Sequence, residues 1–406
     1  MSPAASTRPP STPARVVPVP AGAAGLAVMR GVVAAALAGR EVSALLPAYA
    51  RPAMVQRIAE EFTARPEVPW PADAAVVCPT SGSTGAPRAV VLTTANLRAS
   101  AAATHSHGSG PPPAWFSCLP PATVASLMCV VRAAESGSMT GIWSGAGAGR
   151  PFTVAEFRAD AEEFRTRVRT ELGASTPIRM VLVPTQAARL FTDPSVADTL
   201  AHFDTVVVGG GPISAHLERM AQDTAVHLVR SYGLTETCGG VVHDGRPLPG
   251  VSVRVVDGEL TVGGPMVADT YTDAPLPRVD GHFRTGDRAT IAADGTVTIS
   301  GRIDEVVAIK GSNVDRAAVA RVLSGVSGVR DCAVVALPHP IDGHHLVAYL
   351  VGTASAEVLR TAAAAELGSV AVPEIRRVPE LPLLPGGKVD LTALTAAEPT
   401  TTRACT

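Results

Sequence analysis

The sequence predicts an α/β protein with a large N-terminal domain of mostly parallel sheets, a small antiparallel β subdomain within that domain, and a small α+β C-terminal domain. Short apolar runs alternate with helical patterns over roughly the first 250 residues, which is typical of parallel sheets covered by helices on both faces. From residue 251 onward, apolar residues alternate with polar ones, as in antiparallel strands. A chain of 406 residues has room for two or three compact domains.

The N-terminal segment is rich in proline, alanine and serine. It lacks the basic-then-apolar order of a secretory signal, so we expect a disordered lead-in over residues 1–22. The large domain is expected over 23–303, and its residues 23–48 predict one or two amphipathic helices. Short apolar runs predict buried strands at 74–78, 180–183, 205–208 and 226–229.

The antiparallel part begins with a predicted hairpin. Two alternating strands flank Asp257 and Gly258, a pair favoured in tight hairpin turns, and a further alternating run covers 296–300. The C-terminal domain is expected over 304–406, which is within the usual size range of a domain. Its sequence predicts a helix, two strands and a second helix at 316–323, 332–337, 346–351 and 356–367.

Composition argues against several classes of function. The 34 basic and 36 acidic side chains give a formal net charge of -2, so we expect no nucleic-acid partner and no membrane partner. The best candidate for a membrane span is flanked by Arg30 and Arg40 and is too short to cross a bilayer. The six cysteines form no CxxC pair, which favours reduced thiols and a cytoplasmic protein over a disulfide framework or a zinc site.

Lysine is rare in this chain. Of the 34 basic residues only Lys310 and Lys388 are lysines, and the others are arginines. The two lysines are either chance survivors of this bias or positions where a compact, flexible ammonium is needed in place of a guanidinium.

A loop rich in hydroxyl and glycine residues, TSGSTGAPR, follows the predicted strand at 74–78 and precedes a helical pattern from Thr94. Its backbone N–H groups, its hydroxyls and the guanidinium of Arg88 can surround phosphates. The spacing is not that of a Walker A loop. Taken alone, the segment predicts a phosphate-binding loop and a plain surface turn about equally.

Three later loops carry candidate chemistry of the same kind. In SYGLTE, Tyr232 can stack on a base, Thr235 can donate to a phosphate, and Glu236 is a hard oxygen ligand suited to Mg²⁺. The carboxylate of FRTGD, Asp287, can accept hydrogen bonds from two neighbouring ribose hydroxyls. The turn LPGGK ends in one of the two lysines. Each of these loops, considered singly, also has the composition of an ordinary polar turn.

The four loops occur in one order after predicted strands, and together they resemble the adenylate-forming superfamily of acyl-CoA synthetases, peptide-synthetase adenylation domains and luciferases. The resemblance covers roughly residues 74–392, and the matching runs are TSGSTGAPRAV, GGGP, YGLTE, GELTVGGPMVADTY, FRTGD, GRIDEVVAIKG and PGGKVDL. Within the superfamily, the run SYGLTETCGGVVHDGRPLPGVSVRV looks most like the short o-succinylbenzoate-CoA ligases.

The resemblance implies ATP, Mg²⁺ and coenzyme A as cofactors or co-substrates. It assigns catalytic roles to Arg88, Thr235, Glu236 and Lys388, with Glu236 also the Mg²⁺ ligand, and it makes Asp304 the hinge of a mobile C-terminal domain. The residues that it assigns to nucleotide and CoA binding are Thr80, Ser81, Gly82, Ser83, Thr84, Gly85, Gly209, Gly210, Gly211, Pro212, Tyr232, Gly233, Asp287, Arg302, Lys310 and Gly311.

The reaction that the resemblance implies has two halves. A carboxylate attacks the α-phosphorus of ATP and pyrophosphate leaves, while Lys388 contacts both reacting anions. The C-terminal domain then turns about Asp304, withdraws Lys388 and presents the Lys310-Gly311 turn to the CoA tunnel, so that a thiolate attacks the acyl-adenylate. One active site is expected to serve both reactions.

Two departures from the family pattern stand out. Arg88 replaces the lysine that is common in the phosphate loop, and this keeps the charge. Ala122 and Thr123 stand where o-succinylbenzoate-CoA ligases usually carry paired histidines near the acyl pocket, so we expect a changed pocket and a different acid. The apolar wall of that pocket is expected from residues 124–128 and 238–240.

The leading hypothesis is an ATP-dependent acid-CoA ligase of specialised biosynthesis that acts on a small-molecule carboxylic acid, with a homodimer as a further expectation. The alternatives are an adenylating enzyme with a non-CoA acceptor or an unusual oxyacid, an o-succinylbenzoate-CoA ligase of menaquinone synthesis, and a non-catalytic nucleotide-binding homologue. The presence of Lys388, Glu236, Asp287 and Arg302 argues against the non-catalytic homologue.

Overall fold

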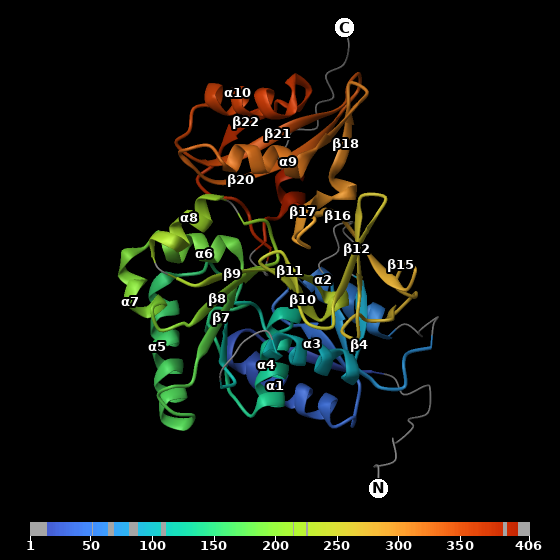
Figure 1. The fold of residues 1–406 in the computed structure, drawn as a ribbon, viewed down its shortest axis with the longest axis vertical. Helices are drawn as coiled ribbons and strands as arrows, with labels where there is room; N and C mark the ends of the chain where they lie inside the picture. Colours follow the sequence, from blue (N-terminus) through green and yellow to red (C-terminus); the bar gives the residue numbers. More distant parts are fainter. Residues whose placement is uncertain are drawn as a thin grey trace.

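A computed structural model of the chain shows a large N-terminal domain below a small C-terminal domain (Figure 1). The structure describes residues 14–50, 52–63, 69–80, 88–106, 111–213, 215–224, 226–384 and 388–396. Parallel sheets, an antiparallel subdomain and an α+β C-terminal domain are all present. The predicted fold class is therefore confirmed.

The first sheet of the large domain has the strand order β1-β2-β3-β4-β14. β1, β2 and β3 are parallel, whereas β4 and β14 run antiparallel to their neighbours. Alternate residues of the strands pack on α1 and on α2, so both faces are covered. The bounds are β1 Arg15–Val19, α1 Gly22–Leu37, β2 Ser43–Pro47, α2 Pro52–Thr63, β3 Ala74–Pro79, β4 Ala89–Thr93, α3 Thr94–Ser106 and β14 Thr270–Tyr271.

The prediction for the N-terminal region is wrong in two respects. The lead-in expected over 1–22 is ordered where the structure describes it, since β1 pairs in parallel with β2 and α1 begins at Gly22. The region 23–48, predicted as helical throughout, contains α1 and then β2. β2 is the short run SALLP, which pairs on one side with β1 and on the other with β3. This strand pairing overrides the helical propensity of the local sequence.

The TSGSTGAPR loop connects two antiparallel strands. The helix expected from Thr94 is confirmed as α3, but the strand β4 that precedes it was not predicted. β3 ends at Pro79, β4 begins at Ala89, and α3 follows at Thr94. The N–H of Thr80 donates to the carbonyl of Arg88 at 2.7 Å, which closes the base of the loop. Residues 81–87 lie outside the described residues.

The second sheet has the order β11-β10-β9-β8-β7-β5-β6, with β10 and β11 antiparallel and the other neighbouring pairs parallel. The strands predicted at 180–183, 205–208 and 226–229 are confirmed as β7, β8 and β9, with small shifts at the ends. The bounds are β5 Ala114–Ser117, α4 Val124–Ser136, β6 Thr140–Ile142, α5 Val154–Glu171, β7 Ile178–Leu182, α6 Pro184–Phe191, η1 Pro194–Val196, α7 Ala197–Leu200, β8 Thr205–Gly209, α8 Ala215–Asp223, β9 Leu228–Leu234, η2 Thr235–Thr237, β10 Gly239–His243 and β11 Arg246–Pro247.

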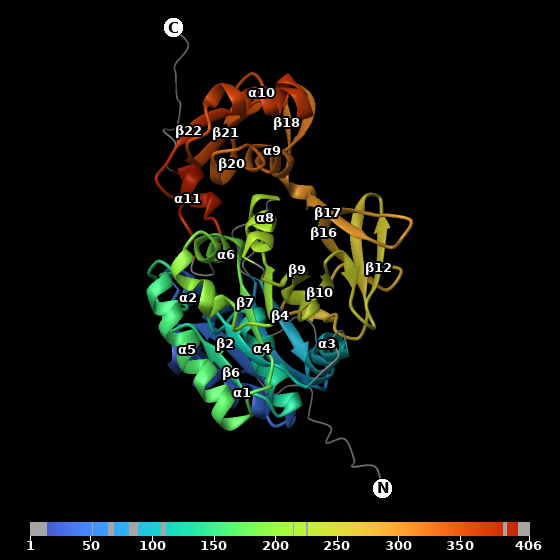
Figure 2. The ribbon, with the colours of Figure 1, turned by 60° about the vertical axis from the view of Figure 1, so that its left-hand side comes forward.

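The large core lies between these two sheets and their helices. Phe116 of β5 packs edge-on against Phe157 and at a tilt against Phe164, both of α5, with ring centroids 6.1 and 5.5 Å apart. α6 and α8 lie at the end of the second sheet that faces the C-terminal domain (Figure 2). Within the described part of the chain, no helix combines the length and the apolar character needed to cross a membrane.

The antiparallel subdomain has the strand order β12-β13-β16-β15, and β17 pairs with β16. The predicted hairpin is confirmed: Asp257 and Gly258 both have positive φ angles, 52° and 80°, as its tight turn requires. The run predicted at 296–300 lies within β17. The bounds are β12 Ser252–Val256, β13 Glu259–Gly263, β15 Arg278–Val279, β16 His282–Ile291 and β17 Val297–Arg302.

The C-terminal domain has its own core, which supports a boundary near Asp304. Its sheet has the order β20-β21-β22, and separate apolar clusters cover the two faces of that sheet. All four predicted elements are present. The bounds are η3 Ile303–Glu305, β18 Val306–Ile309, β19 Ser312–Asp315, α9 Arg316–Ser324, β20 Val329–His339, β21 Gly343–Gly352, α10 Ala356–Leu367, η4 Ser369–Ala371, β22 Glu374–Arg377 and α11 Leu391–Ala396.

Polar contacts close to Asp304, the expected hinge residue, fix how the two domains meet. Arg288 of β16 forms an ion pair with Asp315, the residue that also caps the N-terminus of α9. Arg321 of α9 donates to the backbone carbonyl of Ser300. A Cβ atom on Gly301 would lie 3.0 Å from the Cβ of Ala317, so α9 packs closely on β17. These contacts hold the C-terminal domain over the large domain.

Two glycines of the large domain allow a direct test of how closely β9 and β10 approach each other. A Cβ atom on Gly233 of β9 would lie 1.9 Å from the carbonyl oxygen of Gly239, whereas a Cβ on Gly31 of α1 would meet nothing within 4 Å. Gly233→Ala should lower the free energy of unfolding by about 1–3 kcal/mol through overpacking. Gly31→Ala should raise it by about 0.5–1 kcal/mol because alanine favours the helix. Urea denaturation followed by circular dichroism measures both, and equal effects would contradict the close approach of β9 and β10.

Candidate active site

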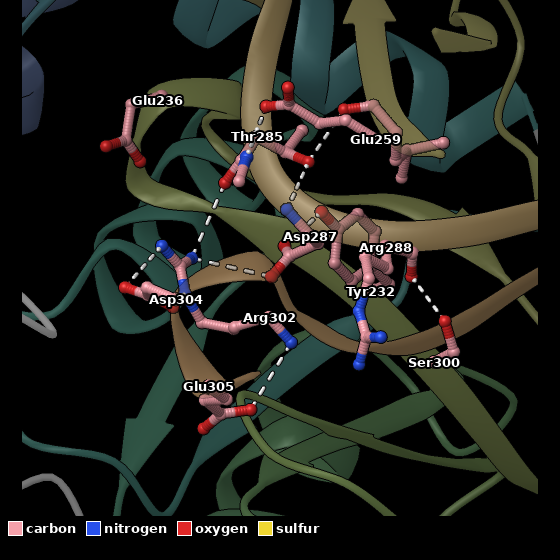
Figure 3. A network of polar contacts seen from close by, with 12 residues as sticks. Tyr232, Glu236, Glu259, Thr285, Asp287, Arg288, Ser300, Arg302, Asp304 and Glu305 are labelled. Carbon is pink, nitrogen blue, oxygen red and sulfur yellow. Dashed lines mark hydrogen bonds and ion pairs between the residues drawn. The ribbon is translucent and has the colours of Figure 1, made fainter. Parts of the chain in front are cut away.

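The candidate site is centred on Asp287, which lies at the junction of β9, β16 and β17 (Figure 3). The Tyr232 hydroxyl donates to Oδ2 of Asp287 at 2.6 Å. Nη1 of Arg302 lies 3.4 Å from Oδ1 of the same carboxylate, and Asp287 and Arg302 are register partners on β16 and β17. The structure therefore brings together three of the predicted site residues, which come from three strands.

Asp287 is a buried acceptor, with 6% of its surface exposed. Burial raises the pKa of this carboxyl, and the hydrogen bond from Tyr232 and the charge of Arg302 oppose that rise. Burial together with the nearby carboxylate raises the pKa of the Tyr232 hydroxyl, which remains a donor. An aromatic ring beside a fixed carboxylate can hold a base next to a pair of sugar hydroxyls.

The TGD motif, which lies within β16, is held by a residue that the sequence analysis did not select. Glu259 of β13 accepts hydrogen bonds from the backbone N–H of Gly286, at 2.8 Å, and from the guanidinium of Arg284. Gly286 has a φ of +72°, and a Cβ there would lie 2.9 Å from Nη2 of Arg302. The glycine of the motif is thus needed for the local backbone and for the approach of Arg302.

Arg302 connects the site to the expected hinge. Its Nε donates to Oδ1 of Asp304 at 2.9 Å, and its backbone N–H donates to Oε2 of Glu305 at 3.3 Å. Asp304 lies in the short helix η3 between β17 and the C-terminal domain. The residue that faces Asp287 is therefore coupled to the backbone about which the C-terminal domain is expected to turn.

Thr235 and Glu236 follow β9 directly in the short helix η2. Oε1 of Glu236 accepts a hydrogen bond of 2.9 Å from the hydroxyl of Tyr271. The guanidinium of Arg88 lies over the ring of Tyr271, 3.7 Å from its centroid, and pairs with Asp273 at 3.2 Å. One tyrosine therefore contacts both groups: its ring lies under Arg88, at the end of the phosphate loop, and its hydroxyl contacts Glu236, the candidate metal ligand.

Lys388 reaches the same region from the C-terminal domain. Its Cε lies 3.4 Å from the position that a Cβ on Gly210 would occupy. Burial of the ammonium group lowers the pKa of Lys388, the charges of Asp287 and Glu236 raise it, and Arg302 lowers it further. The structure thus brings the lysine into the electrostatic range of the three charged residues predicted for the site.

The predicted glycines have different reasons for being glycine. A Cβ on Gly209 would lie 2.7 Å from the carbonyl oxygen of Ser231, so the pairing of β8 with β9 requires a glycine there, as the close approach of β10 does at Gly233. Gly210 has a φ of +78°. Gly211 and Pro212 are exposed.

The remaining predicted residues fall into two groups, one outside the described residues and one placed away from this site. Ser81, Gly82, Ser83, Thr84 and Gly85 lie outside the described residues, although Thr80 closes the base of their loop. Lys310 and Gly311 form the tight turn between β18 and β19, a hairpin that points away from the large domain in Figure 1. Lys310 lies 3.9 Å from Asp342, and Gly311 would place a Cβ in open space.

The expected acyl-pocket residues do lie together. Cγ of Met128 of α4 is 3.8 Å from the position of a Cβ on Gly239, and Cys238, the residue before Gly239, is fully buried. Thr123 caps α4, since its hydroxyl accepts from the N–H of Ser126 at 3.4 Å. The carbonyl of Ala122 is 3.8 Å from the Sγ of Cys78. Of the two residues that stand where the resembling ligases are expected to carry histidines, Thr123 therefore has a structural role as a helix cap.

A buried arginine beside this wall was missed by the sequence analysis. Arg132 lies one helical turn beyond Met128 and is 6% exposed. Its guanidinium lies over the ring of Trp115 at 4.9 Å, and burial lowers its pKa. Its Nε finds no hydrogen-bond partner among the described residues. A charged residue in the otherwise apolar run VASLMCVVRAA was the available signal.

Glu236 is compatible with a magnesium ion. A carboxylate oxygen is the ligand type that Mg²⁺ prefers, and Mg²⁺ usually completes its shell with water and phosphate oxygens. No cluster of three His, Cys, Asp or Glu side chains that could hold a metal occurs in the described ranges. A magnesium ion at Glu236 would therefore depend on the phosphates of a bound nucleotide.

Comparison with known proteins agrees with this geometry. Residues 30–272 match the family described as AMP-binding enzyme, and residues 318–388 match the AMP-binding enzyme C-terminal domain. A probable 2-succinylbenzoate-CoA ligase of Mycobacterium tuberculosis is 35% identical over 334 residues, which are 79% of this chain and 84% of that protein.

Two solved structures share the fold. The o-succinylbenzoate CoA synthetase MenE of Bacillus subtilis, in complex with an acyl-adenylate intermediate, gives a TM-score of 0.73 at 19% identity and covers 95% of this chain and 88% of that chain. The amide bond synthetase McbA of Marinactinospora thermotolerans gives 0.71 at 21% identity, with 96% and 90% covered. The family match spans more than half of the chain, and the first relative covers most of it. The chain therefore belongs to the AMP-binding enzyme family.

Proposed function

We propose that this protein is an ATP-dependent acid-CoA ligase that activates a small carboxylic acid as an acyl-adenylate and transfers the acyl group to CoA. The observation that carries the proposal is the position of Lys388, which reaches Gly210 from the C-terminal domain and is influenced by Asp287 and Glu236. A non-catalytic homologue would have no need of a desolvated lysine at this point.

In this proposal the nucleotide is held by residues of both sheets. The ring of Tyr232 packs on adenine, and Asp287 with Arg302 holds the ribose hydroxyls. Thr80 and Arg88, together with the loop between them and Thr235, bind the phosphates. Glu236 is the protein ligand of Mg²⁺, which supplies a Lewis acid that offsets charge on the phosphate oxygens.

Lys388 is the residue that acts between the two reacting anions. A carboxylate and the α-phosphate repel each other as they approach, and an ammonium group between them offsets that repulsion. Its burial makes the charge more effective because less water screens it. A lysine suits this task because its ammonium is compact and its stem flexible, which also accounts for its survival in an arginine-rich chain.

The second half-reaction needs the other end of the C-terminal domain. A turn about Asp304 would withdraw Lys388 and bring the Lys310-Gly311 turn toward the site, where it would line the path of the CoA thiol. The contacts of Arg302 with both Asp287 and Asp304 support a hinge that is coupled to the nucleotide site.

Two candidates remain for the acid substrate: o-succinylbenzoate and a different carboxylic acid. The replacement of the expected histidine pair by Ala122 and Thr123 supports an acid other than o-succinylbenzoate. Two observations support the o-succinylbenzoate-CoA ligase alternative. The chain is 35% identical to a probable 2-succinylbenzoate-CoA ligase, and the buried Arg132 can pair with a second anionic group of the substrate. We favour an acid other than o-succinylbenzoate, because the absence of the two histidines is the larger change in the hydrogen-bond donors of the pocket.

The setting of the enzyme is also proposed. All five cysteines in the described residues are free, which supports a reducing, cytoplasmic environment. The homodimer remains a prediction.

Lys388→Ala should reduce adenylate formation on the order of 10² to 10³-fold, because one preorganised contact to the developing charge is lost. Thioester formation from a supplied acyl-adenylate should be unchanged, since the lysine is withdrawn in that step. ATP–pyrophosphate exchange and acyl transfer measure the two halves separately. Lys310→Ala, the other lysine, is the control and should leave the exchange rate unchanged. Exchange at the parent rate in Lys388→Ala would remove the assignment.

Gly311→Leu should slow CoA transfer and leave pyrophosphate exchange near the parent value, because the added side chain narrows the thiol path without touching ATP. The φ of +77° at this position makes any larger residue strained. Gly258→Leu is the matched control, since Gly258 has a φ of +80° and also faces open space. If Gly311→Leu and Gly258→Leu slow acyl transfer to CoA equally, or if Gly311→Leu transfers the acyl group at the parent rate, the tunnel assignment fails.

o-Succinylbenzoate should be a poor substrate. A lost hydrogen bond to a charged group costs roughly 1.5–3 kcal/mol, about one to two decades in affinity. The measurement is kcat/KM for o-succinylbenzoate beside a panel of aromatic and alicyclic acids. A value above about 10⁴ M⁻¹s⁻¹, the lower edge for an enzyme on its own substrate, with no better acid in the panel, would support the menaquinone alternative instead.

A further inference from the structure

The segment 268–273 lies between the candidate metal ligand and the phosphate loop. The backbone N–H of Ala268 donates to the carbonyl of Glu236 at 2.8 Å, and the Tyr271 hydroxyl donates to Oε1 of the Glu236 side chain at 2.9 Å. Glu236 is therefore held through its backbone and its side chain by the same short segment. No other described side chain donates a hydrogen bond to this carboxylate.

The same tyrosine holds Arg88. The guanidinium carbon of Arg88 lies 3.7 Å above the ring centroid of Tyr271, and the second contact of the guanidinium is Asp273, two residues further along. A cation over the face of an aromatic ring is attracted by the ring quadrupole, more strongly when water is excluded. The ring of Tyr271 thus positions the cation of the phosphate loop, while its hydroxyl positions the carboxylate.

Strand pairing makes Tyr271 a rigid support. β14 pairs with β4 so that Tyr271 faces Val90, and the N–H of Thr272 donates to the carbonyl of Ala89 at 2.9 Å. The hydroxyl of Thr272 is 2.8 Å from Oε1 of Glu61, which also accepts from the N–H of Ala89. Tyr271 is 6% exposed. Its ring and hydroxyl are therefore held in place before any ligand binds.

The hydroxyl of Tyr271 is also chemically suited to a donor role. Donation to one carboxylate oxygen limits rotation of the Glu236 side chain and leaves the second oxygen available to a cation.

We propose that Tyr271 is a positioning residue that orients Glu236 toward the metal with its hydroxyl and holds Arg88 toward the phosphates with its ring. The inference rests on the proposed function of Glu236 as the Mg²⁺ ligand. It adds that the metal and the loop cation are set by one side chain, so that their positions are coupled.

The hydroxyl and the ring are tested with two substitutions. Tyr271→Phe keeps the ring under Arg88 and removes the hydroxyl. It should weaken binding of Mn²⁺ to the complex of the enzyme with α,β-methylene-ATP about tenfold, as measured by electron paramagnetic resonance. The Mg²⁺ concentration for half-maximal pyrophosphate exchange should rise by a similar factor. Affinity for the analogue without metal should be unchanged in Tyr271→Phe and should fall in Tyr271→Leu, which also removes the ring.

A second buried tyrosine provides the control. The Tyr349 hydroxyl donates to the carbonyl of Leu394 at 3.2 Å inside the C-terminal domain. Tyr349→Phe also loses a buried hydrogen bond, and it should leave Mn²⁺ affinity at the parent value. An equal loss of Mn²⁺ affinity in Tyr349→Phe and Tyr271→Phe would overturn the positioning role, since both would then act through general stability.

Glu236→Gln separates this inference from the proposed function. If Glu236→Gln weakens Mn²⁺ binding and Tyr271→Phe does not, Tyr271 is only a core residue and the proposed function stands. If Glu236→Gln leaves Mn²⁺ binding unchanged, the metal-ligand assignment fails, and the positioning role fails with it. Adding Tyr271→Phe to Glu236→Gln should weaken Mn²⁺ binding no further, because the two residues act through one contact. Should Tyr271→Leu not fold, the Phe variant alone decides the role of the hydroxyl.

Discussion

The carboxylate of Asp287 is the constraint on which the rest of the site depends. It receives the Tyr232 hydroxyl from the second sheet and faces Arg302 from the neighbouring strand of the antiparallel subdomain. A buried carboxylate without such partners would be costly, so these contacts fix the angle at which the subdomain meets the sheet. Through Arg302 the same constraint reaches Asp304. The place where the nucleotide is proposed to bind and the place where the domain is proposed to turn are thus one polar network.

The orientation of the C-terminal domain decides which chemistry this arrangement favours. The Arg288–Asp315 ion pair and the contact of Arg321 with Ser300 join the C-terminal domain to β16 and β17, close in sequence to Asp304. With these contacts made, Lys388 reaches Gly210, and the Lys310-Gly311 turn lies away from the candidate site, at the end of the β18–β19 hairpin. The two lysines occupy separate loops of one small domain, and the proposed turn about Asp304 would exchange one loop for the other at the site. This geometry supports adenylation in the orientation described.

Structural and chemical roles overlap in the same motifs. Gly209 and Gly233 are glycines because neighbouring backbone comes too close for a side chain, whereas Gly286 also admits the guanidinium of Arg302. Thr123 caps a helix at a position where the resemblance to o-succinylbenzoate-CoA ligases leads us to expect a histidine. Motif matching treats all such positions as parts of a binding site. Packing separates those that support the backbone from those that face the proposed ligand.

The sequence alone determined the fold class, the order of the four loops and the residue types that the chemistry needs, because these depend on local patterns and on functional groups. It misassigned 43–47, where a strand partner overrides a helical pattern, and it missed β4, which lies between the phosphate loop and the helix expected from Thr94. Only the tertiary structure decided that Tyr271 joins Glu236 to Arg88 and that Arg132 is buried one helical turn from Met128. Tyr271 lies 35 positions from Glu236, and the two meet because β14 pairs with β4. Such contacts depend on strand register and domain orientation, which no local pattern specifies.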